Sequence, residues 1–173
     1  MNSGYQEQYY LDWTNALIEQ VRGWRIPDTF YNGVRYEAGE IVEIFRNAFL
    51  DKWLSFEFHG AFQNSLKPSL GWCVVASYAW KILFPAFGVD RTPEHEHTWN
   101  TYSPRSERVE KFDLTKCQFG SEDEAESYYK DGIRGKSKKF LKANYKIIES
   151  SAKYEEKAKR FLAAVLKGKD GKD

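Results

Sequence analysis

The sequence predicts an α+β domain in which several helices surround a small antiparallel sheet. Residues 72–84 are apolar nearly all round, which is typical of a helix buried in a core. Two runs rich in strand-forming residues follow at 95–102 and 108–114, and the turn-forming segment 103–106 separates them. Together these segments indicate a buried helix that packs on a hairpin.

The N-terminal third of the chain is expected to be mostly helical. Residues 7–24 carry apolar side chains at steps of three and four, and Pro27 ends this helix. A second helix is predicted over residues 37–54, with Trp53 on its buried face. Residues 55–71 are rich in turn formers, so we expect an irregular segment that leads into the buried helix.

The segments that flank the predicted hairpin are a connector and a series of helices. Residues 85–93 begin and end with proline and are expected to connect the buried helix to the sheet. Beyond the hairpin, helical periodicity recurs in 122–130, 136–148 and 152–166. Helices are therefore expected both before and after the buried helix and the hairpin in the chain.

Length and composition fit a soluble domain with its own core. The chain has 173 residues, of which 42% are hydrophobic and 17% aromatic, so it can fold without disulfides or metals. No apolar run approaches the ~20 residues that span a bilayer, and no signal peptide is visible. We expect an N-terminal helical extension over 1–35, the α+β domain over 36–168 and a disordered tail over 169–173. A reducing, cytoplasmic compartment and no membrane partner are expected.

Charge is unevenly distributed although the net charge is only +1. Residues 130–173 hold 14 basic and 6 acidic residues, whereas residues 1–129 hold 12 basic and 19 acidic residues. A basic segment of this kind binds nucleic acid or an acidic partner, forms a solvated helix face, or docks on the acidic remainder of the chain. No nucleic-acid motif accompanies the lysines, and a nucleic-acid partner is therefore not expected.

Cys73 is the residue most informative about chemistry. It follows Gly71 and Trp72 and stands at the expected first turn of the buried helix. A helix N-terminus presents free backbone N–H groups and a partial positive charge, which together stabilise a thiolate. The position suits a nucleophile, although a small buried cysteine also occurs as an ordinary core residue.

Two histidines and an aspartate complete the candidate site. His95 and His97 leave the predicted strand on the same face, and Asp113 lies on the next strand of the hairpin. In one interpretation an imidazole deprotonates Cys73 and the carboxylate orients the imidazole. The alternatives are a zinc site made by His95, His97 and Asp113 or a cysteine, and polar strand-edge residues without chemistry.

Cys117 is the second cysteine and follows Asp113 closely in the chain. We predict a structural thiol, because a reducing compartment disfavours a disulfide with Cys73. Two cysteines also match no zinc-finger spacing. We expect no cofactor and no bound metal.

Three sequence blocks share a pattern with a known family. They are Gly71-Trp72-Cys73-Val74-Val75-Ala76, His97-Thr98-Trp99-Asn100 and Phe112-Asp113-Leu114-Thr115-Lys116-Cys117-Gln118-Phe119. In this order they resemble the small bacterial YunG-like family, whose blocks are a cysteine-bearing helix start, an H-x-W-N strand and a D-L-T-x-x-Q-F strand end. The resemblance covers about residues 40–166. It implies a papain- or transglutaminase-like fold in which a buried cysteine-bearing helix packs on a small antiparallel sheet.

The resemblance assigns roles residue by residue. Cys73 matches the nucleophile and Asp113 matches the acid that orients the base. His97 matches the base in preference to His95, because His97 opens the H-x-W-N block. Trp99 belongs to the same block and is expected to support the site.

The sequence departs from the family at a residue that would contribute to the oxyanion hole. Trp72 stands before the nucleophile, where the family tends to have glutamine, so no adjacent side-chain amide is expected to complete the hole. The backbone N–H of Cys73 remains as one donor. Gln63, Asn64 and Gln118 are the candidates for a second donor.

The residues and the resemblance favour a cysteine-dependent hydrolase or acyl transferase. Such an enzyme, of amidase, deamidase or peptidase type, would act on an amide or ester with a Cys-His-Asp triad. The alternative is a catalytically silent papain-like binding module that acts through protein–protein contacts. The expected partner is a protein or a small-molecule amide.

Overall fold

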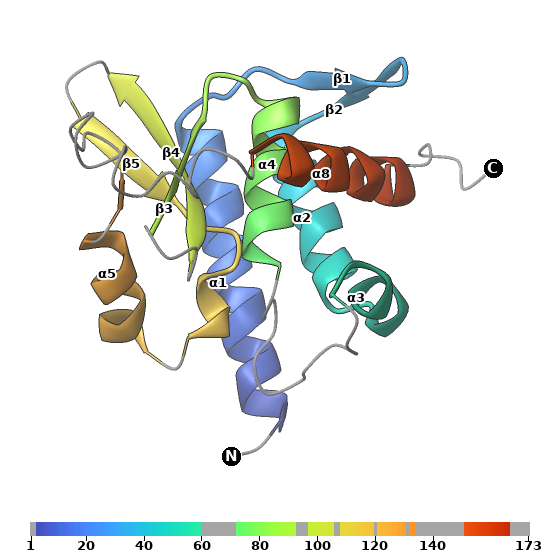
Figure 1. The fold of residues 1–173 in the computed structure, drawn as a ribbon. Coiled ribbons are helices and arrows are strands. Elements are labelled where there is room, and N and C mark those ends of the chain that lie inside the picture. Colours follow the sequence, from blue (N-terminus) through green and yellow to red (C-terminus); the bar gives the residue numbers. More distant parts are fainter. Residues whose placement is uncertain are drawn as a thin grey trace.

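Two small antiparallel sheets and six helices make up the described part of the chain, which confirms the α+β class (Figure 1). The computed structural model describes residues 3–59, 72–92, 97–105, 108–119, 121–130, 132–133 and 151–166. The helices are α1 (Ser3–Gly23), α2 (Ala38–Phe49), α3 (Lys52–His59), α4 (Cys73–Leu83), α5 (Glu122–Lys130) and α8 (Ser151–Val165), with a 3-10 helix η1 (Lys116–Gln118). The strands are β1 (Thr29–Tyr31), β2 (Val34–Tyr36), β3 (Gly88–Arg91), β4 (Thr98–Arg105) and β5 (Arg108–Phe112).

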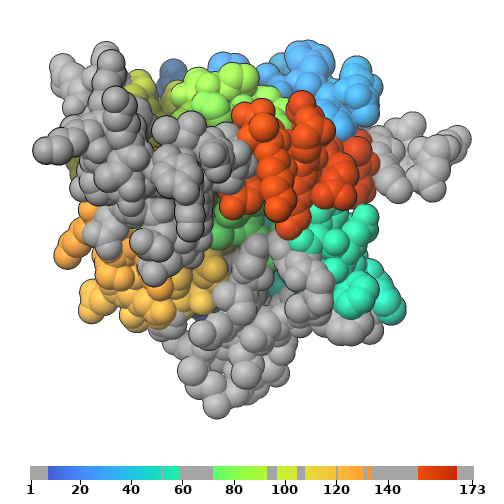
Figure 2. Space-filling view, in the orientation of Figure 1, coloured from blue at the N-terminus to red at the C-terminus, as the bar shows by residue number. Residues whose placement is uncertain are grey.

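Helix α4 occupies the middle of the molecule, between the sheet β3-β4-β5 and helix α8 (Figure 1). All but three of its residues are buried, as predicted for the apolar run 72–84. On the outer side, α8 lies at the surface and covers part of α4 (Figure 2). The N-terminal end of α4 is thereby held between the strand β4 and a surface helix.

Large aromatic side chains fill the core on both sides of α4. Trp80 contacts Phe112 of β5 with 4.6 Å between the ring centroids. Trp72, the residue before α4, contacts Phe49 of α2 and Phe161 of α8, each at 5.2 Å. These rings are fully buried, and each contributes about 1.5–3 kcal/mol by leaving water. They fix α4 against the sheet and against the surrounding helices.

The predicted helix over 37–54 is wrong in one respect, because the structure divides it into α2 and α3. The carboxylate of Asp51 accepts hydrogen bonds from the backbone N–H groups of Trp53 (2.9 Å) and Leu54 (3.0 Å), and so caps a new helix. Trp53 is 65% exposed, not buried as predicted. Residues 55–59 are helical where an irregular segment was predicted, and 60–71 lie outside the described residues.

Two strand features were not predicted. A hairpin joins β1 to β2 through Asn32 (φ 50°) and Gly33 (φ 78°), the left-handed pair that a tight type I′ turn requires. Strand β3 lies in the expected connector 85–93 and pairs with β4. Its sequence has little strand propensity, and pairing with β4 explains why it is extended.

The C-terminal half follows the remaining predictions in part. The predicted turn at 103–106 is misplaced, because β4 continues to Arg105, with a shift in pairing after Tyr102. Helices α5 and α8 confirm the predictions over 122–130 and 152–166. The predicted helix 136–148 lies outside the described residues, as does the tail 169–173.

Helix α1 packs against α2 and contributes to the same core as α4. Tyr10, Leu17 and Val21 are buried in that core, on the stripe that the sequence predicts. In the part of the chain that the structure describes, no helix has the length and hydrophobicity needed to cross a bilayer.

Candidate active site

His97 lies at the centre of the candidate site, immediately before β4. Its side chain is fully buried, and its Nε2 atom is 2.6 Å from Oδ2 of Asp113. Asp113 follows the last residue of β5, which pairs with β4, so the sheet brings base and acid together. The carboxylate of Asp113 is hydrogen-bonded to Nε2, and Nδ1 of the imidazole faces other partners.

Asp113 is held by a set of donors beyond His97. The hydroxyl of Tyr129 donates to Oδ2 at 2.6 Å, and both the backbone N–H (3.0 Å) and the hydroxyl (3.2 Å) of Thr115 donate to Oδ1. Burial by itself would raise the pKa of Asp113, but His97, Tyr129 and Thr115 together hold that pKa below the ordinary 3.8. The carboxyl group is therefore ionised although it is buried.

Cys73 begins α4 and reaches His97 from the other side. Its side chain is nearly buried, and it lies close enough to His97 to contribute to the raised pKa of that imidazole. Because Nε2 faces Asp113, Nδ1 is the other nitrogen of the ring, and the Gln118 amide also lies beside it. The cap residue Trp72 makes no side-chain hydrogen bond to the first N–H groups of α4, and a helix N-terminus carries a partial positive charge.

The pKa of His97 records the balance of these contacts. Burial by itself would lower it, but the charge and hydrogen bond of Asp113 and the weaker contribution of Cys73 raise the pKa to about 9. At neutral pH the imidazole is therefore a cation that lies between a carboxylate and a thiol.

Aromatic rings enclose the imidazole. Trp99 stacks on it with 5.6 Å between centroids, and Phe119 meets it edge-on at 4.7 Å. Tyr128 and Tyr129 of α5 lie about 6 Å away, at 6.0 and 6.1 Å. Rings at these distances exclude water and attract a cation through their π faces. Trp99, predicted as a supporting residue, thus lies directly against the candidate base.

Gln118 is the amide that the structure brings to the site. Its Nε2 lies 3.2 Å from Nδ1 of His97 and donates to the hydroxyl of Thr115 at 3.0 Å. Through Thr115 it also connects to the carboxylate of Asp113. Gln63, Asn64 and His95, the other residues predicted near the site, lie outside the described residues.

Two residues that contact Asp113, and a third that joins β4 to α4, were not predicted from the sequence. Thr115 caps Asp113 from two positions downstream, a local turn that the D-L-T spacing could have suggested. Tyr129 comes from α5, where a pair of tyrosines in a strongly charged helix was the only signal. Asn100 donates through Nδ2 to the carbonyl oxygens of Ser77 (2.9 Å) and Gly88 (3.2 Å), and so joins β4 to α4.

The end of β5 is also fixed from the N-terminal helix. Trp13 of α1 donates through Nε1 to the backbone carbonyl of Asp113 at 3.3 Å, and the ammonium of Lys116 lies over the Trp13 ring. The ammonium of Lys111 lies 4.7 Å from the ring centre of Tyr129 and forms an ion pair with Glu126. These contacts hold the residues that donate to Asp113 in place.

A metal centre has no geometric support in the described residues. They contain no group of three or more His, Cys, Asp or Glu side chains arranged to hold a metal ion. His97 instead directs one ring nitrogen to Asp113. The zinc hypothesis also requires His95, which lies outside the described residues.

Comparison with known proteins assigns no family to this chain. No family model, no curated protein and no solved structure matches it.

Proposed function

We propose that the protein is a cysteine-dependent hydrolase or acyl transferase that acts on an amide or ester. The observation that carries this proposal is the buried His97–Asp113 pair beside Cys73, in which the imidazole is hydrogen-bonded to a carboxylate and lies near a thiol. The proposal includes a papain- or transglutaminase-like fold and the likeness to the YunG-like family. The packing of α4 on an antiparallel sheet that carries base and acid supports the proposed fold.

In the first half-reaction the Cys73 thiolate attacks the carbonyl carbon of the substrate. A C–S bond forms and the π electrons of the carbonyl move onto its oxygen. When this oxyanion collapses, the bond to the leaving amine or alcohol breaks and the Nδ1–H of His97 donates its proton to the leaving group. The products are an acyl-thioester at Cys73 and a neutral imidazole.

In the second half-reaction water or an amine attacks the thioester. His97 accepts the proton of the attacking group through Nδ1, the C–S bond breaks, and the thiolate–imidazolium pair is restored. Asp113 keeps its charge throughout and stabilises the imidazolium through Nε2. Attack by water gives hydrolysis or deamidation, and attack by an amine gives transfer.

Gln118 is suited to stabilise the oxyanion. When His97 is protonated, Nδ1 carries a hydrogen and cannot accept one from the Gln118 amide. One N–H of Gln118 stays bound to Thr115, and the other becomes available to an oxygen next to Nδ1. Together with the backbone N–H of Cys73, this donor would complete a two-donor hole for the oxyanion.

Acylation of Cys73 is the experiment that tests the proposal. The protein is incubated at pH 7 with 4-nitrophenyl acetate, release of 4-nitrophenol is followed, and intact mass spectrometry locates the acetyl group. We expect a burst of 4-nitrophenol and an acetyl group on Cys73, because a thiolate beside an imidazolium attacks an activated ester rapidly.

Two variants separate the proposal from its alternative. Cys117→Ser keeps the burst and Cys73→Ser loses it, while circular dichroism shows that both are folded. Folded wild-type protein that forms no acyl-thioester contradicts the proposed activity. That result would favour the silent papain-like binding module, in which the same scaffold acts through protein contacts.

A further inference from the structure

A cavity of about 610 Å³ lies between the C-terminal end of α1 and the turn end of the β4–β5 hairpin. Both segments lie at the end of the molecule away from the N-terminus (Figure 1). The described residues that line the cavity are Gly23, Trp24, Arg25, Pro104, Arg108 and Glu110. Cys73, His97 and Asp113 are not among them, so the cavity is separate from the candidate active site. Its volume is that of clefts that bind small molecules.

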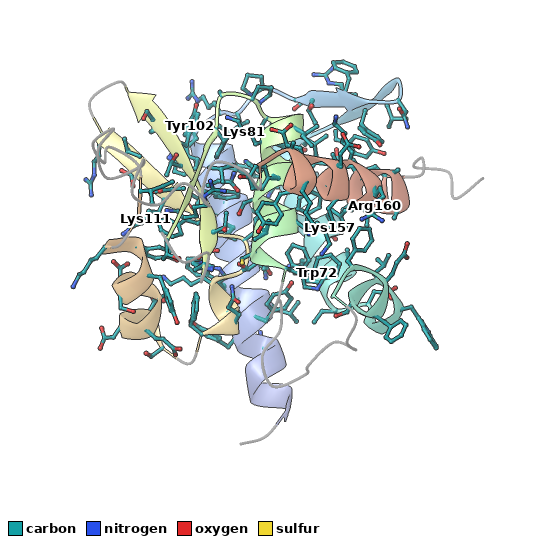
Figure 3. All side chains as sticks on the ribbon, in the orientation of Figure 1. Trp72, Lys81, Tyr102, Lys111, Lys157 and Arg160 are labelled. Atoms are coloured by element: carbon teal, nitrogen blue, oxygen red, sulfur yellow. The ribbon has the colours of Figure 1, made fainter. Side chains whose placement is uncertain are left out.

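The ring of Trp24 forms a rigid apolar wall of this cavity. It is half-buried, and it packs against Tyr102 of β4, labelled in Figure 3, with 5.0 Å between the ring centroids. It also contacts Phe112 at 6.1 Å and Phe87 at 6.2 Å. The core therefore holds the ring in place while part of it stays exposed. A fixed aromatic ring next to Pro104 suits a flat, apolar group of a ligand.

Arg25 has a backbone conformation that favours glycine. Its φ of 54° lies in the left-handed region. Its N–H donates to the carbonyl of Arg22 (3.0 Å) and the N–H of Ile26 donates to that of Val21 (3.5 Å), the Schellman pattern at a helix end. Glycine adopts this conformation without the steric cost that a side chain adds. Arginine at this position therefore costs stability, and it adds an exposed guanidinium to the wall of the cavity.

Arg108 brings a second guanidinium to the cavity from β5. The pairing of β4 with β5 shifts between Tyr102 and Arg105, and Pro104 lies within this bulge. Bulges redirect side chains near the ends of strands. The side chain of Arg108 is 84% exposed, and its Nε lies 3.2 Å from Oε1 of Glu110. Because a guanidinium has five N–H donors and this one faces solvent, it can bind an anion while it keeps the ion pair.

We propose that this cavity binds a small phosphate ester with a flat ring, the class to which nucleoside monophosphates belong. The guanidinium groups of Arg25 and Arg108 supply charge-assisted donors whose planar geometry matches phosphate oxygens. Two such groups favour a phosphate, which carries nearly two negative charges at neutral pH, over a single carboxylate. The Trp24 ring contacts the flat part of the ligand. The inference does not depend on the chemistry proposed for Cys73.

Isothermal titration calorimetry at low ionic strength tests the inference with adenosine 5′-monophosphate, adenosine and inorganic phosphate. We expect the monophosphate to bind at least about tenfold more tightly than the other two, because only it contacts both the arginines and the Trp24 ring. Arg25→Gln should weaken this binding about tenfold. Arg22→Gln is the matched control and should keep the affinity within about twofold. Arg22 lies one turn earlier, forms ion pairs with Glu19 and Glu37 and does not line this cavity.

Three results of the titration overturn the inference. The first is that the monophosphate does not bind at millimolar concentration. The second is that inorganic phosphate binds as tightly as the monophosphate, which removes the role of Trp24. The third is that Arg25→Gln and Arg22→Gln weaken binding equally, which indicates only a general effect of charge.

Arg25→Gly separates binding from a structural role of the side chain. Because glycine relieves the left-handed strain, we expect the melting temperature to rise by about 2–4 °C. The monophosphate should nevertheless bind about tenfold more weakly, as it should in Arg108→Gln. A variant Arg25→Gly that binds the monophosphate as tightly as wild-type protein overturns the inference. A lower melting temperature also overturns it, because the side chain would then serve the fold.

Discussion

The two cysteines of this chain are almost equally buried, and they differ in the ionisable groups that lie beside them. Cys73 is 8% exposed and lies near the imidazole of His97, whereas Cys117 is 3% exposed and lies near the carboxylate of Asp113. Burial, Asp113 and Glu122 raise the pKa of Cys117 far above its ordinary value, and Lys116 offsets only part of this effect. Cys117 is therefore a neutral thiol at physiological pH.

Cys73 is separated from the carboxylate of Asp113 by the imidazole of His97. The imidazolium stands between sulfur and carboxylate, so that the nearest charge to Cys73 is positive. Burial is costly for any thiolate, and the outcome depends on whether a cation is next to it. The comparison shows that a candidate nucleophile is identified by the group beside it and not by its degree of burial.

The sharpest test of this comparison is the reactivity of the two thiols. At pH 6.5 we expect iodoacetamide to label Cys73 roughly 10³-fold faster than Cys117, since only a thiolate attacks the reagent. Peptide mass spectrometry after timed quenching gives both rates. In 8 M urea the two residues should react alike. Equal rates in native protein would remove the basis for a nucleophile at Cys73.

Removing the cation should make Cys73 resemble Cys117. In His97→Ala we expect labelling of Cys73 at pH 6.5 to slow by roughly 10²-fold, because burial is then uncompensated. Asp113→Asn should slow it less, because the imidazole remains. A His97→Ala rate within twofold of wild type would show that the helix terminus alone activates the thiol.

Stability should depend on pH through His97. Its pKa is about 9 in the folded protein and about 6.5 in an unfolded chain, so the folded state holds the proton more tightly. The resulting stabilisation, about 3 kcal/mol, is fully present below pH 6.5 and is lost as pH rises through 9. Urea unfolding at pH 6 and pH 10 measures it. His97→Gln should lose this pH dependence, and an unchanged dependence in that variant would assign it to other groups.

Tyr129→Phe should have a smaller effect that extends the comparison to α5. The variant removes one charge-assisted hydrogen bond to Asp113 without altering the packed ring. We expect a loss of about 2 kcal/mol in the free energy of unfolding, and a rise in the pKa of Asp113 that shifts acid unfolding to higher pH. Tyr128→Phe on the same helix is the matched control. Equal losses in both variants would indicate a general effect of the tyrosine hydroxyls.

The smallest expected effect is that of Cys117→Ala. Only a small buried side chain is removed, so the free energy of unfolding should fall by about 1 kcal/mol and the labelling rate of Cys73 should not change. Thermal unfolding and the iodoacetamide rate check the two parts. A marked change in the labelling of Cys73 would mean that Cys117 takes part in the site.

The parts of the site that follow from sequence lie in short contiguous blocks. His97 and Trp99 belong to one strand block, and Asp113 and Gln118 to another, so their mutual geometry depends on local structure and on one strand pair. Tyr129 was missed because α5 reaches Asp113 only through tertiary packing, which no local pattern records. The same reason explains β3, whose extended form depends on β4.

The fold, like the site, has elements that follow from a local sequence pattern and elements that do not. Helix α4 was predictable because its apolar residues surround the whole helix, whereas the break between α2 and α3 depends on one side chain, Asp51. The exposure of Trp53 follows from that break, since α3 no longer continues the buried face of α2. The apolar periodicity over 37–54 predicts one continuous helix, and a single capping residue is a weaker indication that the helix is interrupted.

The amide of Asn100 has a consequence for how such a site could be transplanted. It anchors the strand that follows His97 to the carbonyl of Ser77, one helical turn beyond Cys73. Nucleophile, anchor and base therefore all lie in one uninterrupted stretch, residues 73–100, and only Asp113 and its donors come from elsewhere. A designer who grafts this stretch onto another helix-and-sheet scaffold would carry along the hydrogen bond that joins β4 to α4. Fine adjustment of the spacing between sulfur and imidazole would then begin at position 100, a residue that takes no part in the chemistry.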